Sequence, residues 1–188
     1  MQVMSLSDLI EDAGEETTKG ILSCFCISRN PDVERFIRNL AIPYEKSHNA
    51  RTFLFLNDNR KPLGFVALSL TSLRIPDGIS SNLERKLKGY GRFSSDNIPC
   101  YLIGQLARFD AAEKDELSGN DIFSIVSDYV KESQNLFGGR VVSIDCADDL
   151  VQYYEKRGFV ALNKIEDLNQ MVYLIKDIKD DLQVVPEL

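Results

Sequence analysis

The sequence has no tryptophan and one histidine among 188 residues. His48 lies in a polar stretch and belongs to no pattern typical of a catalytic triad, so we expect it at the surface. Cys24 and Cys26 form only a C-x-C pair, while Cys100 and Cys146 each stand alone. Because zinc sites need four ligands, usually in C-x2-4-C or H-x3-5-H spacings, we expect no metal site. Reduced cysteines packed as small apolar side chains are the simpler interpretation.

Long hydrophobic runs and an excess of positive charge are also absent. No apolar run approaches the roughly 20 residues that cross a bilayer, and residues 1–14 carry acids where a signal peptide carries basic residues. We therefore expect a cytoplasmic protein with no membrane partner. The 22 Lys and Arg face 29 Asp and Glu, a formal net charge of −7. With 44% hydrophobic and 27% charged residues, the composition is that of a globular protein and excludes collagen-like, coiled-coil and disordered classes.

No repeat, low-complexity tract or Pro/Gly/Ser-rich linker divides the chain. At about 150 residues per domain, its length predicts one domain over 1–188 with a core that needs neither disulfides nor metals.

Hydrophobic periodicity predicts helices interleaved with strands. Helices are expected at 5–13, 31–43, 83–89, 121–137 and 149–157. The second has Asn30 as its cap, and Pro43 closes or kinks it; the third is a short basic helix or turn. The fourth carries Leu136 and Phe137 on its apolar face, and the fifth has Lys156 and Arg157 in its last turn before Gly158. Strands are expected at 51–56, 63–70, 98–106, 140–146, 159–162 and 171–175. The run 63–70 is nearly all apolar, which indicates burial on both faces of a sheet. The fold class is therefore mixed α/β.

Three segments of the second half carry a family resemblance. They are the strand Leu102-Ile103-Gly104-Gln105-Leu106-Ala107, the helix start Leu117-Ser118-Gly119-Asn120-Asp121, and Tyr153-Tyr154-Glu155-Lys156-Arg157-Gly158-Phe159. In this order they resemble the GNAT superfamily of acetyl-CoA-dependent N-acetyltransferases, and the last is similar to its F-Y-x-x-x-G-F signature. The resemblance implies a central, mixed, splayed β-sheet flanked by helices, with acetyl-CoA (coenzyme A) as cofactor.

The first half resembles the GNAT subgroup that includes bacterial toxins paired with antitoxins. Phe25-Cys26-Ile27-Ser28-Arg29-Asn30-Pro31, continuing to Phe36-Ile37, is similar to its pattern of a phenylalanine, a cysteine or serine, and then N-P-x-x-x-x-F-L. The likeness covers about residues 20–176, with short extensions at both ends. It implies an amine-bearing acceptor, such as an aminoacyl-tRNA, and an antitoxin as partners.

The resemblance also implies which residues bind the cofactor. The backbone of Leu106, Ala107 and Arg108 would pair with the pantetheine arm. The diphosphate would lie on the start of the following helix, where unpaired N–H groups and the helix dipole favour an anion. The residues there are Ser118, Gly119, Asn120, Asp121 and Ile122.

This loop departs from the family pattern Q/R-x-x-G-x-G/A. Glu116 stands at the first position and Asp121 at the last, so only Gly119 is retained. Asp121 adds a negative charge where a small residue would let the backbone approach phosphate. Alternatively, Ser118 or Asn120 caps a structural helix and Asp121 complements its dipole.

By match to the signature, Tyr154 is the residue placed to protonate the leaving coenzyme A thiolate. Packing of the helix against the sheet is the alternative role for this tyrosine. The central strand offers no carboxylate as general base, because Gln105 cannot take a proton. Cys146 has no histidine to activate it, so we expect it to pack in the core.

Two classes of function remain open. An active N-acetyltransferase would use the cations Arg85, Lys86, Lys88 and Arg92 to attract an acidic acceptor such as charged tRNA. The net charge opposes binding to tRNA, and a solvated helix face is the simpler interpretation of these cations. A non-catalytic GNAT-fold binding module with a degenerate cofactor loop is the other class. A homodimer is compatible with both.

Overall fold

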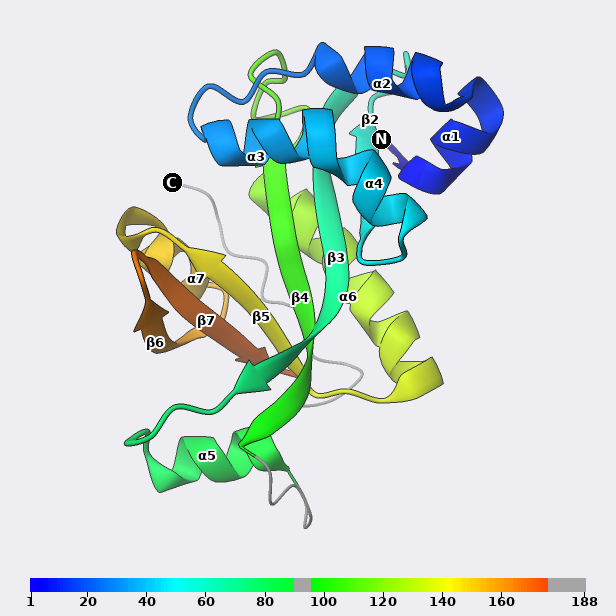
Figure 1. The fold of residues 1–188 in the computed structure, drawn as a ribbon. Helices are drawn as coiled ribbons and strands as arrows, with labels where there is room; N and C mark the ends of the chain where they lie inside the picture. Colours follow the sequence, from blue (N-terminus) through cyan, green and yellow to red (C-terminus); the bar gives the residue numbers. More distant parts are fainter. Residues whose placement is uncertain (90–95, 176–188) are drawn as a thin grey trace. The chain divides into compact units, whose positions relative to one another are not determined.

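The structure is a computed structural model that describes residues 1–89 and 96–175. Its sheet has the strand order β1-β2-β3-β4-β5-β7-β6 (Figure 1). The strands are β1 (Gln2–Ser5), β2 (Arg51–Leu56), β3 (Pro62–Arg74), β4 (Asn97–Arg108), β5 (Val141–Cys146), β6 (Val160–Ile165) and β7 (Leu168–Leu174). Strands β4 and β5 are parallel, whereas β1/β2, β2/β3, β5/β7 and β6/β7 are antiparallel. The predicted mixed α/β architecture is confirmed.

Helices precede and connect the strands. They are α1 (Leu6–Ala13), α2 (Glu15–Ser23), α3 (Pro31–Arg35), α4 (Ala41–Lys46), α5 (Ser81–Lys88), α6 (Gly119–Phe137) and α7 (Val151–Glu155). One π-helical turn, Phe36–Leu40, joins α3 to α4, and one 3-10 turn, Asp148–Leu150, precedes α7. None of the helices in the described ranges is long and apolar enough to span a membrane.

The chain divides into two compact units. Unit 1 comprises Met1–Ser69 and Ile103–Ile122, and unit 2 comprises Leu70–Leu102 and Phe123–Leu188. Strands β3 and β4 and helix α6 each contribute residues to both units. The single domain expected over 1–188 stays a prediction.

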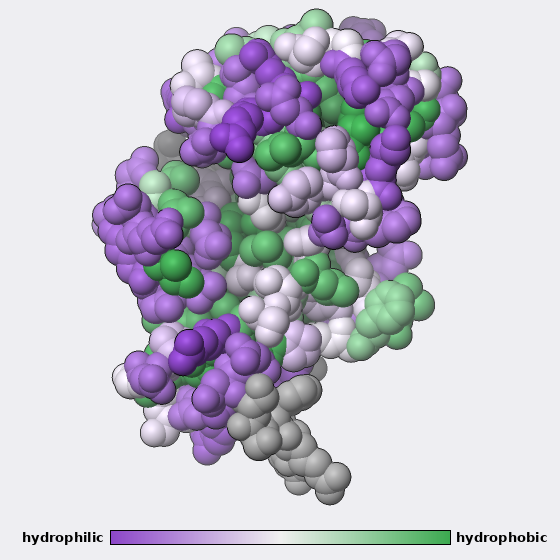
Figure 2. Space-filling view, in the orientation of Figure 1, coloured by the Kyte–Doolittle hydropathy of each residue, from purple (hydrophilic) through white to green (hydrophobic). Residues whose placement is uncertain are grey.

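Unit 1 packs helices α1–α4 against strands β2 and β3 (Figure 1). Phe25 stacks on Phe109 with ring centroids 4.0 Å apart, and Phe65 stacks on Phe109 at 6.1 Å. The five residues 63–67 of β3 are buried in succession, which confirms burial on both faces for this part of the predicted run 63–70. Burial does not extend to the end of the run, because Leu70 is 73% exposed. The outward surface of these helices is largely hydrophilic in Figure 2.

The helix after Asn30 begins as predicted and ends later. The Asn30 side chain accepts a hydrogen bond from Val33 N at 3.2 Å, and Pro31 occupies the first turn. Pro43 does not close the helical run, which continues to Lys46. The π-helical turn shifts the hydrogen-bond register, so that Pro43 lies in the first turn of α4, where a missing N–H is tolerated.

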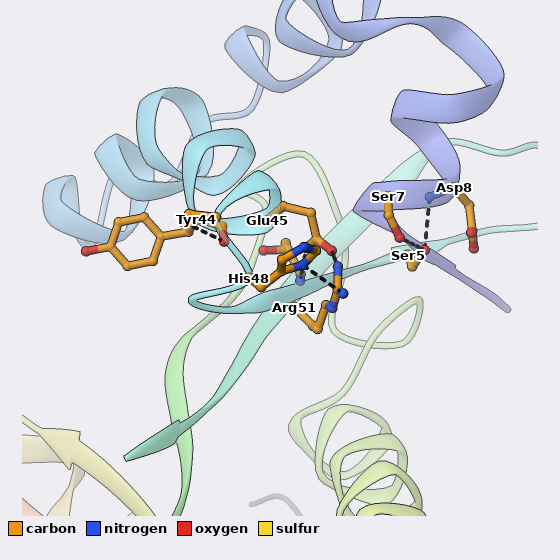
Figure 3. Close-up of polar contacts among 9 residues, drawn as sticks. Ser5, Ser7, Asp8, Tyr44, Glu45, His48 and Arg51 are labelled. Carbon is orange, nitrogen blue, oxygen red and sulfur yellow. Dashed lines mark hydrogen bonds and ion pairs between the residues drawn. The ribbon is translucent and has the colours of Figure 1, made fainter. Parts of the chain in front are cut away.

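A buried carboxylate fixes the start of β2 (Figure 3). Glu45 is 3% exposed; its Oε2 accepts from Thr52 N at 2.8 Å, and its Oε1 accepts from Arg51 Nη1 at 2.6 Å. The exposed His48 ring lies beside Arg51, with Nδ1 3.2 Å from Nη2. His48 therefore lies at the surface, as predicted. The sequence did not predict that Glu45, three residues earlier, is buried.

Unit 2 has its own core, formed by Leu73, Ile75, Leu87, Ile98, Cys100, Val141, Leu162 and Val172. Helix α6 buries Phe123, Val126 and Val130 in the protein interior. The predicted apolar face does not extend to its end, because Leu136 is 70% exposed and Phe137 is 83% exposed. Figure 2 shows the end of α6 as a hydrophobic patch.

Candidate functional site

The strand residues expected to pair with the cofactor lie at the end of β4, in unit 1. Leu106, Ala107 and Arg108 are each partly buried. A Cβ added at Gly64 of β3 would lie 2.5 Å from the carbonyl oxygen of Ala107 and 3.1 Å from Cα of Arg108. Gly64 therefore lets the backbone of β3 approach this stretch more closely than any other residue could.

Arg108 connects the end of β4 to the loop before α6. Its Nη1 donates to the carbonyl oxygen of Leu117 at 3.4 Å. Within unit 1 the structure thus brings together the two segments that the resemblance assigns to the pantetheine arm and to the diphosphate. It also places a cation beside the helix start.

The start of α6 is a reciprocal capping box. Asp121 N donates to Ser118 Oγ at 3.2 Å. The Asp121 carboxylate in turn accepts from Ser118 N and from Ser118 Oγ, both at 2.8 Å. These hydrogen bonds confirm that Ser118 and Asp121 cap the helix. The backbone amides of both residues, which could otherwise bind an anion, already donate hydrogen bonds within the capping box. Gly119 and Asn120 are partly buried, and Ile122 is buried.

Glu116 adds a second carboxylate to this loop. Its side chain accepts from Glu113 N at 3.0 Å and lies 4.0 Å from Lys61 Nζ. The backbone hydrogen bond from Glu113, assisted by the charge of Lys61, lowers the pKa of Glu116, so this group is ionised at neutral pH. The assignment of the pantetheine arm to the backbone of β4 stays a prediction. At the α6 start, a diphosphate would have to displace or share the position of the Asp121 carboxylate.

Tyr154 lies on α7 in unit 2 and is 5% exposed. Its ring makes edge contacts with Phe123, Tyr153 and Phe159, at centroid distances of 6.0, 5.2 and 5.7 Å. Burial strongly raises the pKa of Tyr154; the neighbouring Tyr153 and Cys146 act in the same direction, and Arg157 acts in the opposite one. The phenol is therefore protonated at neutral pH.

The Gly-Phe pair after α7 has a clear structural reason. Gly158 has a φ of 86°, and an added Cβ would meet the Tyr173 ring at 3.1 Å. Phe159 N donates back to the carbonyl oxygen of Tyr154 at 3.1 Å. Glycine permits this left-handed turn, and the turn places Phe159 against Tyr154.

Solved structures resemble the chain over most of its length. A tyrosine-to-phenylalanine mutant of KacT aligns with a TM-score of 0.70 and 15% identity, over 95% of this chain and 98% of that one. AtaTR bound with acetyl-CoA aligns with a TM-score of 0.68 and 16% identity, over 95% of both chains. AtaT complexed with acetyl-methionyl-tRNAfMet aligns with a TM-score of 0.63 and 16% identity, over 82% of this chain and 88% of that one. These neighbours are GNAT-fold bacterial toxins.

The chain has the GNAT fold. At these identities the likeness establishes the fold alone. Neither a family model nor a curated protein matches the sequence.

Sequence reasoning missed one buried residue beside Tyr154 in this GNAT fold. Arg157 is 3% exposed, and its guanidinium carbon lies 3.6 Å from the Tyr153 ring centroid and 5.4 Å from that of Phe123. Its Nη1 donates to the carbonyl oxygen of Tyr153 at 3.2 Å. In the sequence this residue is one of two cations in the last turn, and that pattern alone does not separate the exposed Lys156 from the buried Arg157.

The cysteines divide into two pairs. Cys100 and Cys146 are buried as expected, whereas Cys24 and Cys26 are exposed, at the end of α2 and in the loop after it. Burial raises the pKa of Cys100 to about 11. Burial, with smaller effects from nearby aspartates, also raises the pKa of Cys146, which disfavours a nucleophilic thiolate and supports its assignment to the core.

The cations expected to attract an acidic acceptor lie on α5 of unit 2. Lys88 pairs with Glu84 at 2.8 Å and with Asp96 at 3.1 Å, and these contacts raise its pKa. Arg85 and Lys86 are exposed. Arg92 lies outside the described residues. The described part of the basic segment is therefore partly neutralised by its own neighbours.

Proposed function

We propose that this protein is an acetyl-CoA-dependent N-acetyltransferase that moves the acetyl group to an amine by direct attack. The observation that carries the proposal is the GNAT fold together with Tyr154, which lies on α7 as the F-Y-x-x-x-G-F signature predicts. Structural neighbours of the same fold contain acetyl-CoA, which supports this cofactor for the chain. In unit 1, Leu106, Ala107 and Arg108 would hold the pantetheine arm, and Ser118 to Ile122 the diphosphate.

Tyr154 acts as general acid in this proposal. Acetyl transfer requires a neutral amine, a carbonyl within attack distance and a proton for the departing thiolate. A tyrosine with its ordinary pKa of about 10 is a weaker acid than a simple thiol with a pKa of about 8.5. Burial raises the pKa of Tyr154 further, so the transfer is uphill and its phenol must be regenerated by water. A water chain or an already neutral amine serves as base.

The acceptor we infer is the α-amine of an aminoacyl-tRNA. AtaT, which shares the fold, was solved with acetyl-methionyl-tRNAfMet, and α5 exposes Arg85 and Lys86. The formal net charge of −7 opposes binding to phosphate, so the affinity must come from a local patch rather than from the whole molecule. A paired antitoxin follows from the same likeness, since AtaT was solved bound to AtaR. Homodimerisation stays a prediction.

The second candidate function is a non-catalytic binding module. The capping box at Ser118 and Asp121 favours it, because the carboxylate occupies the helix start that would otherwise receive the diphosphate. The two functions differ in whether the chain binds acetyl-CoA.

Thermal unfolding with and without acetyl-CoA separates the two functions. A ligand that binds only the folded state stabilises it by RT ln(1 + [L]/Kd), about 2.7 kcal/mol at a hundredfold excess over Kd. The enzyme proposal predicts a saturable rise in midpoint, followed by transfer of radiolabelled acetyl to total charged tRNA and not to deacylated tRNA. No shift at millimolar acetyl-CoA would contradict it and leave the binding module.

A further inference from the structure

Arg157 is a buried cation in the turn that follows α7, the helix that carries Tyr154. Taking a guanidinium out of water is costly, so its position calls for compensating contacts. The structure provides them: the cation lies over the face of the Tyr153 ring at 3.6 Å and donates to the Tyr153 carbonyl oxygen. Aromatic faces attract cations in this geometry. Lys156, one residue earlier, carries the same charge and is exposed to solvent.

Tyr154 lies directly beside this arrangement. The Tyr153 and Tyr154 rings meet edge to face at 5.2 Å, and Arg157 N donates to the carbonyl oxygen of Tyr154 at 2.9 Å. Phe123 contacts both the Tyr154 ring and the Arg157 cation. Among the residues that make these contacts around Tyr154, Arg157 is the one that carries a positive charge.

A buried general acid creates an electrostatic problem that such a charge offsets. Once Tyr154 has given up its proton, its oxygen carries a negative charge among Phe123, Tyr153 and Phe159, which provide no charge of opposite sign. A charge that develops in a place shielded from water is stabilised more by a fixed cation than it would be in water. Burial and the neighbours Tyr153 and Cys146 raise the pKa of Tyr154, and Arg157 is the group that lowers it.

We propose that Arg157 is a positioning residue for Tyr154: its guanidinium, held over the Tyr153 ring, stabilises the phenolate that forms when Tyr154 donates its proton. The proposal rests on the proposed function for the identity of the proton acceptor. In the step itself the Tyr154 O–H bond breaks, an S–H bond forms on the coenzyme A thiolate, and the tyrosine is left as a phenolate. Water then returns a proton to the phenolate.

The direct test replaces Tyr154 by 3-nitrotyrosine, whose phenolate absorbs visible light and forms while the protein is folded. The ionisation of this residue is titrated in the otherwise unchanged chain and in the Arg157→Met, Arg157→Lys and Lys156→Met variants. We expect Arg157→Met to raise the nitrophenol pKa by about one unit, a tenfold change in its ionisation constant. Arg157→Lys restores part of the difference, because it retains a charge without the planar fork. Lys156→Met removes an exposed charge of the same sign and leaves the pKa unchanged.

Cooperative thermal unfolding is recorded for each variant, so that nitrophenol pKa values are compared between folded chains only. Arg157→Gln, which keeps hydrogen-bond donors and removes the charge, replaces Arg157→Met if the latter does not fold. An unchanged pKa in a folded neutral variant, or an equal shift in Lys156→Met, overturns the proposal.

A kinetic readout separates this proposal from the proposed function. With acetyl-CoA and charged tRNA as substrates, Arg157→Met should lower kcat about tenfold in the Tyr154 protein and have no further effect in the Tyr154→Phe background. A merely structural role of Arg157 would lower kcat in both backgrounds and contradict the proposal. Absence of transfer by the unchanged chain, together with the expected pKa response, would refute the proposed function and leave the role of Arg157 toward the phenol intact.

Discussion

At the scale of single residues, the burial of Tyr154 determines how the proposed chemistry depends on pH. Burial raises its pKa above the ordinary value of about 10. A phenol is the acid form below its pKa, so Tyr154 retains its proton through the whole neutral and mildly alkaline range. We expect kcat to show no decline attributable to Tyr154 between about pH 7 and pH 10 in a pH–rate profile. A decline above about pH 8 that disappears in Tyr154→Phe would contradict this assignment.

Asp121 is the residue whose removal should strengthen cofactor binding. Its carboxylate accepts from Ser118 N, at the helix start where an anion would otherwise be stabilised. Asp121→Ala should tighten acetyl-CoA binding about three- to tenfold in calorimetric titration, because it removes a negative charge and releases that amide.

Asp128→Ala is the matched control for Asp121→Ala, since it removes an exposed charge from the same helix two turns further on. The loss of the capping box itself is measured separately, as a lower unfolding midpoint of the ligand-free protein. Weaker acetyl-CoA binding by Asp121→Ala would show that the carboxylate assists the cofactor site.

At the scale of elements, the close approach of β3 to β4 fixes the strand that would hold the pantetheine arm. A Cβ at position 64 would lie 2.5 Å from Ala107 O and 2.7 Å from Leu117 Cδ2. Gly64→Ala should therefore displace the end of β4 and weaken acetyl-CoA binding at least about tenfold, with a loss of stability of about 1–3 kcal/mol. Gly104→Ala is the control on β4 itself, because its Cβ would meet Ala67 O at an ordinary 3.7 Å. Equal binding by the two variants would disprove this role of Gly64.

The turn between α4 and β2 depends on one buried carboxylate. The side chain of Glu45 is 2% exposed and that of its partner Arg51 is 50% exposed. Arg51→Ala should destabilise the protein by about 1–3 kcal/mol in urea unfolding, because Glu45 keeps only the Thr52 amide as partner in the core. Lys46 lies on the same helix as Glu45 and forms a solvent-exposed ion pair with Glu15 of α2. Lys46→Ala breaks this pair and should change stability little. A comparable loss in both variants would contradict the importance of burial here.

The sequence predicted elements well where local signals were strong. Asn30-Pro31 marks a helix start, the apolar run of β3 indicates burial, and α6 follows from its 3.6-residue period. Strand β1, helix α2 and the π-helical turn escaped prediction, because β1 is stabilised by pairing with β2 and a π turn has no local sequence signature.

The candidate site was only partly predictable. The signature located Tyr154 and the loop pattern located the capping pair Ser118 and Asp121, but which of two adjacent cations is buried depends on packing. Likewise, the clash that Gly64 avoids involves Ala107 and Leu117, which are distant in sequence and therefore invisible to local patterns.

At the scale of the whole molecule, charge constrains the acceptor. A formal net charge of −7 repels nucleic acid at long range, while the exposed cations Arg85 and Lys86 provide a local attraction. If charged tRNA is the acceptor, its affinity should rest on few phosphate contacts. The slope of log affinity against log salt should accordingly be shallow, at about −1 to −3 by filter binding, because each contact contributes about −0.9. A steep slope would require a more extensive basic surface than α5 provides.

The most direct test of the account compares acetyl transfer by the unchanged chain and by Tyr154→Phe, with radiolabelled acetyl-CoA and charged tRNA. If Tyr154 is the general acid, kcat falls at least about tenfold in Tyr154→Phe, within the usual range for losing a general acid, while the rise in unfolding midpoint caused by acetyl-CoA is unchanged. Equal kcat values in the two proteins would contradict a role of Tyr154 as general acid.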